Sequence, residues 1–346
     1  MTIALFSFRY LSIPNRSLKS FLLLFSFIAT NAFGQLSIEE ASLLARVNFS
    51  SVIPTELVST RSVVIYQNTF TIKELEETQS FFQQTGIDAV AYFEVARVLA
   101  GYDTQKAYAN YFLSRGIKFL IFLQKTEKGY QFLFCPFSSN KELIAETNVT
   151  WKQEHASLTE LLKMIYRFAV SNLKKENFLI NDLPETDITV KFFAGRINET
   201  FATEVKIFKV AIPRFGNAQD DTELETYLKE NFPVKYDLVD KDANETTLLD
   251  KGYKSILRFV HARGILAKEI FGYDITQIAR SLPTATIVNN EVQIKTISAA
   301  QPIYKFYFRN IEYGNIFLGN KWDADVTWQD ALRNHMQALK INQKIN

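Results

Sequence analysis

The amino-acid sequence predicts an α/β protein made of two tandem related domains, each a mixed β-sheet with helices packed on it. The strand-like segment "YQFLFCPFSS", residues 130–139, is nearly copied by "YKFYFRNIEY", residues 304–313. Segments of matching type precede and follow both copies in the same order. The 346 residues are 47% hydrophobic and 22% charged, a balance typical of globular proteins. We therefore expect the chain to encode one folded unit twice.

Residues 1–34 differ in composition from the rest and have the pattern of a secretory signal peptide. Basic residues precede the apolar run "FLLLFSFIATNAFG". Its strongly apolar part is shorter than the roughly 20 residues that span a bilayer, so a cleaved signal is favoured over a membrane anchor. We expect cleavage near Gly34/Gln35 and a periplasmic or secreted mature protein with no stable membrane insertion.

The mature chain is expected to have four parts. A short helix, "SIEEASLLARV", opens it, and the polar stretch "KKENFLINDLPETD" separates the two copies. The predicted boundaries are 35–57 for the N-terminal helical segment, 58–178 for the first repeat, 179–202 for the linker and 203–346 for the second repeat.

Each repeat is predicted to begin with a strand and a helix. "RSVVIYQ" followed by "TIKELEETQSFFQQTG" corresponds to "VKIFKVAIP" followed by "DTELETYLKENFP". A second helix should end at Arg-Gly-Ile in both repeats, where Gly116 and Gly264 would adopt the left-handed conformation of a C-cap. In the first repeat the continuously apolar "IKFLIFLQ" follows and predicts a strand buried on both faces.

Each repeat is predicted to close with a short strand and a helix. The strands should end at Trp151 and Trp322, which would then be equivalent. The helices should begin at capping boxes in which Ser157 and Thr327 are each followed three residues later by an acidic residue. The second repeat carries an extra segment, "ITQIARSLPTATIVNNEVQIKTIS", before its hairpin.

The segments "LSRGIKFLIFLQKTEKGYQFLFCPF" and "SLTELLKMIYRF" combine a helix ending at glycine, a buried strand, a hairpin and a closing helix. This order resembles the small α/β domain at the amino terminus of TolB, which is also seen in periplasmic lipoproteins of the LpoB and CsgG kind. The resemblance implies a non-enzymatic domain that binds proteins or envelope components.

The sequence contains no motif for catalysis, metal binding or cofactor binding. His155, His261 and His335 have no partner at a metal-binding spacing. The segment "DKDANETTLLDK" imitates the start of a calcium loop, but Glu245 replaces the required glycine and Lys251 the bidentate glutamate. Glycine-rich phosphate loops and the Gly-x-Ser-x-Gly elbow are absent from the sequence. We assign no catalytic, metal or cofactor residues.

Cysteine content and net charge narrow the possible classes of function further. Cys135 is the only cysteine, and its position in an apolar strand predicts an inert, buried thiol. The net charge is +2, with no block of five like charges, so nothing suggests the clustered basic face of a nucleic-acid-binding protein.

One strand offers a candidate partner-binding patch. If one face of residues 304–317 is core, Tyr307, Arg309 and Tyr313 could face a partner, because Tyr and Arg are enriched in interfaces. The alternative is that helices cover both faces of this strand.

The sequence therefore favours an exported, periplasmic, non-enzymatic binding or assembly protein of the bacterial cell envelope, with an envelope protein as its partner. The alternative is a secreted or periplasmic hydrolase with a site between the two domains. Convergent carboxylates or a histidine with a shifted pKa between the domains would favour the enzyme, whereas an apolar, tyrosine-rich groove or an open sheet edge would favour binding.

Overall fold

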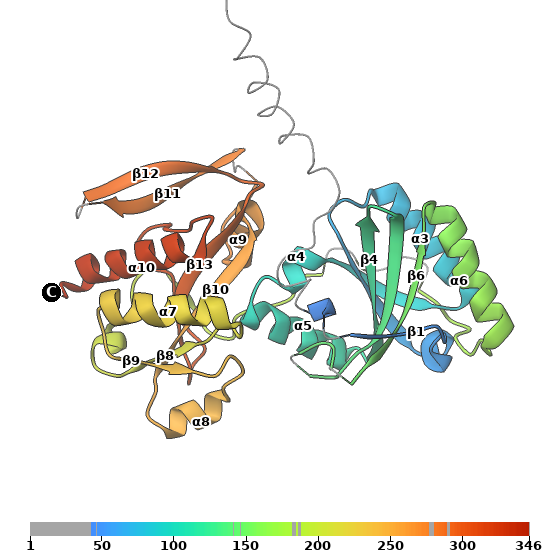
Figure 1. Cartoon of the computed structure of the whole chain (residues 1–346), viewed down its shortest axis with the longest axis horizontal. Helices are drawn as coiled ribbons and strands as arrows, with labels where there is room; N and C mark the ends of the chain where they lie inside the picture. The colour runs from blue at the N-terminus through green and yellow to red at the C-terminus, as the bar shows by residue number, and fades with distance from the viewer. Residues whose placement is uncertain are drawn as a thin grey trace, which may run out of the picture.

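The computed structural model describes residues 43–45, 47–140, 142–145, 147–181, 185, 188–276, 280–288 and 291–345. The predicted signal peptide and most of the predicted N-terminal helix lie outside these residues. Within them, none of the helices has the length and apolar character needed to span a bilayer. The fold is α/β, with two six-stranded mixed sheets and a separate two-stranded sheet (Figure 1).

The first sheet has the strand order β1-β6-β5-β4-β2-β3. Strands β4 and β5 form an antiparallel hairpin, while β2 runs parallel to both β3 and β4. Helices α3 and α6 pack on one face, and α4 and α5 on the other. The elements are β1 (Asn48–Ser50), a 3-10 turn (Thr55–Val58), β2 (Arg61–Tyr66), α3 (Ile72–Thr85), β3 (Asp88–Glu94), α4 (Val95–Val98), α5 (Tyr102–Ser114), β4 (Ile117–Thr126), β5 (Gly129–Pro136), β6 (Val149–His155) and α6 (Leu158–Asn172).

The second sheet repeats this order as β7-β14-β13-β10-β8-β9, with every neighbouring pair in the same relative direction. Two related α/β domains are therefore present, as predicted. The elements are β7 (Ile197–Asn198), a 3-10 turn (Thr203–Lys206), β8 (Val210–Pro213), α7 (Ala218–Asn231), β9 (Tyr236–Val239), α8 (Glu245–Asp250), β10 (Ser255–Arg263), α9 (Gly264–Ile270), β11 (Ser281–Val288), β12 (Glu291–Ser298), β13 (Pro302–Asn310), β14 (Ile316–Phe317) and α10 (Trp328–Gln343).

The extra segment of the second domain lies where the first domain has a two-residue turn. Helix α9 and the hairpin β11-β12 are inserted between β10 and β13. Strand β11 contacts α10, so the inserted hairpin extends over one end of the domain (Figure 1). The insertion was predicted before the hairpin of the second domain, but it lies within that hairpin, between β10 and β13, and it also includes α9.

Strand register identifies equivalent residues in the two domains. Tyr130 pairs with Lys125 across the first hairpin, and Tyr304 pairs with His261 in the second. Counting back nine residues from Lys125 and from His261 reaches Gly116 and Gly252. Both glycines directly follow the C-cap of a helix, with φ of 68° and 88°.

The predicted equivalence of Gly116 and Gly264 is therefore wrong. Residues 255–263 form a strand instead of a helix, and Gly264 is the first residue of α9. The matching letters Arg-Gly-Ile occur at a helix end in one domain and at a strand end in the other. A larger residue at position 264 would be crowded, because a side-chain atom of Leu282 lies 2.7 Å from where the Cβ of residue 264 would be.

The predicted equivalence of the two tryptophans is also wrong. Trp151 lies in β6 opposite Phe134, and the corresponding pair in the second domain is Phe317 opposite Phe308. Trp322 follows β14 and packs edge-on against Phe271, with ring centroids 6.2 Å apart.

The buried faces of both sheets supply the cores. As predicted, β4 is buried along most of its length. Trp151 is fully buried, and its ring lies 4.9 Å from that of Phe134, in the same apolar cluster as Leu158, Leu161 and Leu162. Burying a side chain of this size removes about 150 to 250 Å² from water, so Trp151 is a principal element of the first core.

The two closing helices are capped differently. Thr327 accepts a hydrogen bond from the backbone N–H of Asp330, as predicted. The hydroxyl of Ser157 makes no such bond, so the predicted capping box of α6 is wrong. Instead, the backbone N–H of Ser157 donates to Nδ1 of His155, which holds the imidazole over the start of the helix.

Candidate ligand-binding cleft

The two domains meet through β10 and the segment that joins α4 to α5. The backbone N–H of His261 donates to the carbonyl of Ala100 at 2.7 Å. A Cβ on Gly101 would lie 2.5 Å from the carbonyl oxygen of Phe259, so only glycine allows this approach. The first domain thus contacts the carboxyl-terminal part of strand β10 in the second domain.

Two ion pairs cross the interface. A terminal nitrogen of Arg97 donates to both carboxylate oxygens of Glu269, at 2.8 and 2.7 Å. Arg263 donates in the same way to Glu94, at 2.6 and 2.7 Å. All four side chains are partly buried, so solvent screens these charge pairs less than surface pairs.

A buried polar network also connects the two domains at this interface. The hydroxyl of Tyr307 donates to Asp103 at 2.6 Å, and Arg309 lies 3.2 Å from the same carboxylate. Arg309 also binds Glu245, which Lys106 contacts at 3.1 Å. Burial, and then the negative charge of Asp103, raises the pKa of Tyr307 well above its ordinary value, so this phenol is a permanent donor.

The candidate partner-binding residues therefore do not form one exposed patch. Tyr307 is buried, and Arg309 is almost so, because both contact the first domain instead of solvent. Tyr313 alone is exposed, at 65%. A partner contact at Tyr313 stays a prediction, whereas Tyr307 and Arg309 hold the two domains together.

A cleft with a volume of about 560 Å³ lies beside the two ion pairs. The first domain, the connecting segment and the second domain all contribute to its walls. Aromatic and aliphatic residues make up most of the lining. Burial of Tyr66, and then the negative charge of Glu94, raises the pKa of the Tyr66 hydroxyl. The lining residues are Tyr66, Tyr92, Phe93, Glu94, Arg97, Ile188, Thr189, Val190, Lys191, Phe192, Phe193, Gly195, Ile197, Glu269, Ile270 and Gly272.

The charges in the cleft are arranged for structure rather than for proton transfer. Its two carboxylates, Glu94 and Glu269, are each held by an arginine. A general base or acid requires a carboxylate or histidine within reach of a substrate proton. Among the described residues that line the cleft, no histidine or cysteine is present. The arrangement suits binding of a ligand that presents apolar groups together with polar ones.

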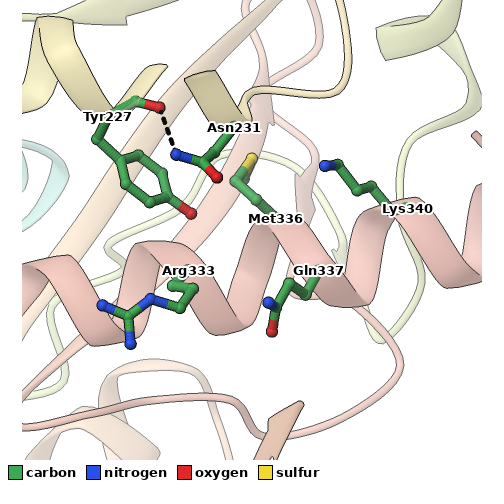
Figure 2. A pocket seen from close by; sticks show the side chains of 6 residues that line it. All are labelled: Tyr227, Asn231, Arg333, Met336, Gln337 and Lys340. Atoms are coloured by element: carbon green, nitrogen blue, oxygen red, sulfur yellow. Dashed lines mark hydrogen bonds between the residues drawn. The ribbon is translucent and has the colours of Figure 1, made fainter. Parts of the chain in front are cut away.

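A smaller pocket of about 270 Å³ lies between α7 and α10. Figure 2 shows the side-chain amide of Asn231 donating to the backbone carbonyl of Tyr227, at 3.1 Å. Arg333, Gln337 and Lys340 lie along α10 on its other side (Figure 2). Burial raises the pKa of Tyr227 to about 12, so its hydroxyl stays protonated.

The sequence did not predict a buried ionic cluster in the second domain. Lys305, Asp323 and His335 are all at most 2% exposed. The ammonium of Lys305 lies 2.7 Å from Asp323, whose other oxygen lies 2.9 Å from Nδ1 of His335. Nε2 of His335 is buried without a partner. The only sequence signal was a lysine within an aromatic strand that helices cover on both faces.

The remaining candidate residues are buried, cap a helix or stack on a neighbouring ring. Cys135 is buried, as predicted, and burial raises the pKa of its thiol to about 12. Asn244, within the calcium-like segment, caps α8 by accepting from two backbone N–H groups. His261 stacks on Tyr304 with ring centroids 3.9 Å apart. No group of three His, Cys, Asp or Glu side chains among the described residues could hold a metal.

No protein-family model matches the chain, and comparisons with curated proteins and with solved structures found no match either. The resemblance to the amino-terminal domain of TolB accordingly stays a prediction.

Proposed function

We propose that this chain is an exported, periplasmic, non-enzymatic binding protein of the bacterial cell envelope, whose interdomain cleft receives an apolar segment of an envelope protein. One observation carries the proposal: the cleft between the domains places aromatic and aliphatic side chains beside fixed polar groups, and both of its carboxylates are engaged by arginines. Concave, mostly apolar sites with a few fixed polar groups are typical of ligand-binding pockets.

The cleft geometry favours this proposal over the hydrolase. Glu94 and Glu269 bind arginines that belong to the opposite domain, so freeing either carboxylate would open the interface. The buried Lys305, Asp323 and His335 cluster lies away from the cleft lining and is closed to solvent. Export rests on the pattern of residues 1–34, and the resemblance of each repeat to periplasmic domains agrees with it.

Capture from envelope extract tests the proposal. Thr189 is exposed and lines the cleft, so Thr189→Trp should fill it without disturbing the core. Thr222 is equally exposed on α7 and is not among the cleft residues, so Thr222→Trp is the matched control. Both tagged variants and the parent are incubated with solubilised envelope, and retained proteins are identified by mass spectrometry.

We expect one envelope protein to be retained by the parent and by Thr222→Trp, but lost with Thr189→Trp. Retention that is equal in all three proteins would refute the cleft as the binding site. Cell fractionation and amino-terminal sequencing of the native protein test export, for which Gln35 is the expected first residue. An intact Met1 on a cytoplasmic species would refute it.

A further inference from the structure

The outer edge of the first sheet is closed by the segment that connects the domains. Glu185 forms a parallel bridge with Ala91 in β3. Its backbone N–H donates to the carbonyl of Val90 at 3.0 Å, and its carbonyl accepts from the N–H of Tyr92 at 3.1 Å. An open strand edge is a template for pairing, and this residue covers the edge of β3.

The side chain of Glu185 strengthens the same contact. Its carboxylate accepts from Arg115 at 2.6 Å and from the hydroxyl of Tyr111 at 3.1 Å. Arg115 is the C-cap of α5 and directly precedes Gly116, whose positive φ ends the helix. The first domain thus shows how this fold holds an added chain: two backbone bonds to the edge strand and one carboxylate on the cationic helix cap.

Strand β9 is the equivalent edge of the second domain. By strand register, Asp237 corresponds to Ala91, and Leu238 corresponds to Tyr92. In a parallel sheet, the backbone groups of successive residues in a strand point alternately to the neighbouring strand on one side and on the other. The carbonyls of Lys235 and Val239 accept hydrogen bonds from the β8 side, so the backbone groups of these two residues point toward β8. The N–H of Leu238 therefore faces outward, as does the carbonyl one residue before Asp237. No segment in the described part of the chain pairs with β9 on that side.

The cationic helix cap is also repeated. Lys251 is the C-cap of α8 and precedes Gly252, at the position that Arg115 and Gly116 occupy in the first domain. Lys251 is exposed and has no carboxylate partner among the described residues. The acidic residue on β9, Asp237, already accepts from Tyr253 at 2.6 Å and from a lysine at 3.0 Å. Lys251 is therefore left to attract a further carboxylate.

We propose that the outer edge of β9 binds an extended peptide segment of a partner protein, in the parallel orientation, through an Asp or Glu residue. The backbone of that residue bonds the carbonyl of Tyr236 and the N–H of Leu238, while its carboxylate reaches Lys251. Main-chain pairing supplies affinity and the side-chain contact supplies selectivity, as in other strand-addition sites. The site is separate from the interdomain cleft and does not depend on a ligand there.

The probe is a fluorescent synthetic peptide with the sequence of residues 180–188, "INDLPETDI", which contains the residue that closes β3. Its binding to the full chain is measured by fluorescence anisotropy. Leu238→Pro removes the outward N–H and leaves the bonds between β8 and β9 intact. Loss of this bond and of pairing on that side should weaken binding by at least about tenfold, because the peptide then lacks a backbone hydrogen-bond donor on β9.

The controls distinguish binding through backbone pairing from binding through charge and from binding in the interdomain cleft. A peptide N-methylated at its Glu and a peptide with Lys in place of that Glu should both bind at least about tenfold more weakly. The Thr189→Trp variant should bind the peptide like the parent. Unchanged affinity for Leu238→Pro, with unchanged thermal unfolding, would overturn the proposal. A purified chain that is dimeric until Leu238→Pro makes it monomeric would also overturn it, because a second copy would then be the occupant.

Discussion

The buried ionic cluster of the second domain should be sensitive to loss of one charge. Asp323→Asn preserves shape but removes the carboxylate that lies 2.7 Å from the Lys305 ammonium, and Lys305 is 0% exposed. The carbonyls of Phe306 and Leu318 also accept from this ammonium, at 2.9 and 2.6 Å, but they carry no net charge. The variant therefore buries an uncompensated cation.

Breaking a buried ion pair by removing one partner costs about 3 to 5 kcal/mol. With a urea dependence of roughly 2 kcal/mol per molar, the second domain should unfold at a urea concentration about 2 M lower. That loss is a large part of the roughly 5 to 15 kcal/mol that stabilises a domain. Asp250→Asn, an exposed substitution in the same domain, should change the free energy of unfolding by less than about 0.5 kcal/mol.

Tryptophan fluorescence in a Trp151→Phe background reports on the second domain, because Trp322 and Trp328 both lie there. The double variant Lys305→Met with Asp323→Asn tests the physical reason, since it removes both charges. It should recover at least half of the lost stability. A single variant that loses under about 1 kcal/mol, or a double variant without recovery, would refute the argument that an unpaired charge sets the cost.

Two further predictions concern the cores and acid sensitivity. Trp151→Ala should destabilise the first domain by about 3 to 5 kcal/mol in urea unfolding, because it leaves a cavity beneath α6, whereas the exposed Lys163→Ala should have little effect. Equal, small shifts would place Trp151 outside the core. Burial opposes ionisation of Asp323, yet Lys305 and then His335 outweigh it and lower its pKa, while burial lowers the pKa of His335. Both folded-state pKa values lie below those of the unfolded chain, so stability is lost on acidification. The contribution of His335 is lost below about pH 6.5, and that of Asp323 only below about pH 4. The urea midpoint of the second domain should therefore fall between pH 7 and pH 4, and the double variant should keep that dependence, because His335 stays buried in it.

The sequence by itself determined the α/β class, the presence of two related units and the buried central strand β4. Alternating aromatics in residues 130–139 and 304–313 predicted a hairpin strand, because a pleated strand places successive side chains on opposite faces. The N-cap of α10 at Thr327 was equally local, since the capping contact spans three residues. Such features depend only on residues that are close together in the sequence.

The tertiary structure alone decided which residues are equivalent and which are functional. Matching letters paired Gly116 with Gly264, but strand register pairs it with Gly252, because Arg263-Gly264 lies where β10 ends and α9 begins and not at the end of a helix. The sequence left open whether Tyr307 faces a partner or is covered, and the packing of the first domain against it decided this. Contacts between residues that lie some 200 positions apart depend on how two sheets are placed in space, and no local pattern in the sequence encodes that placement.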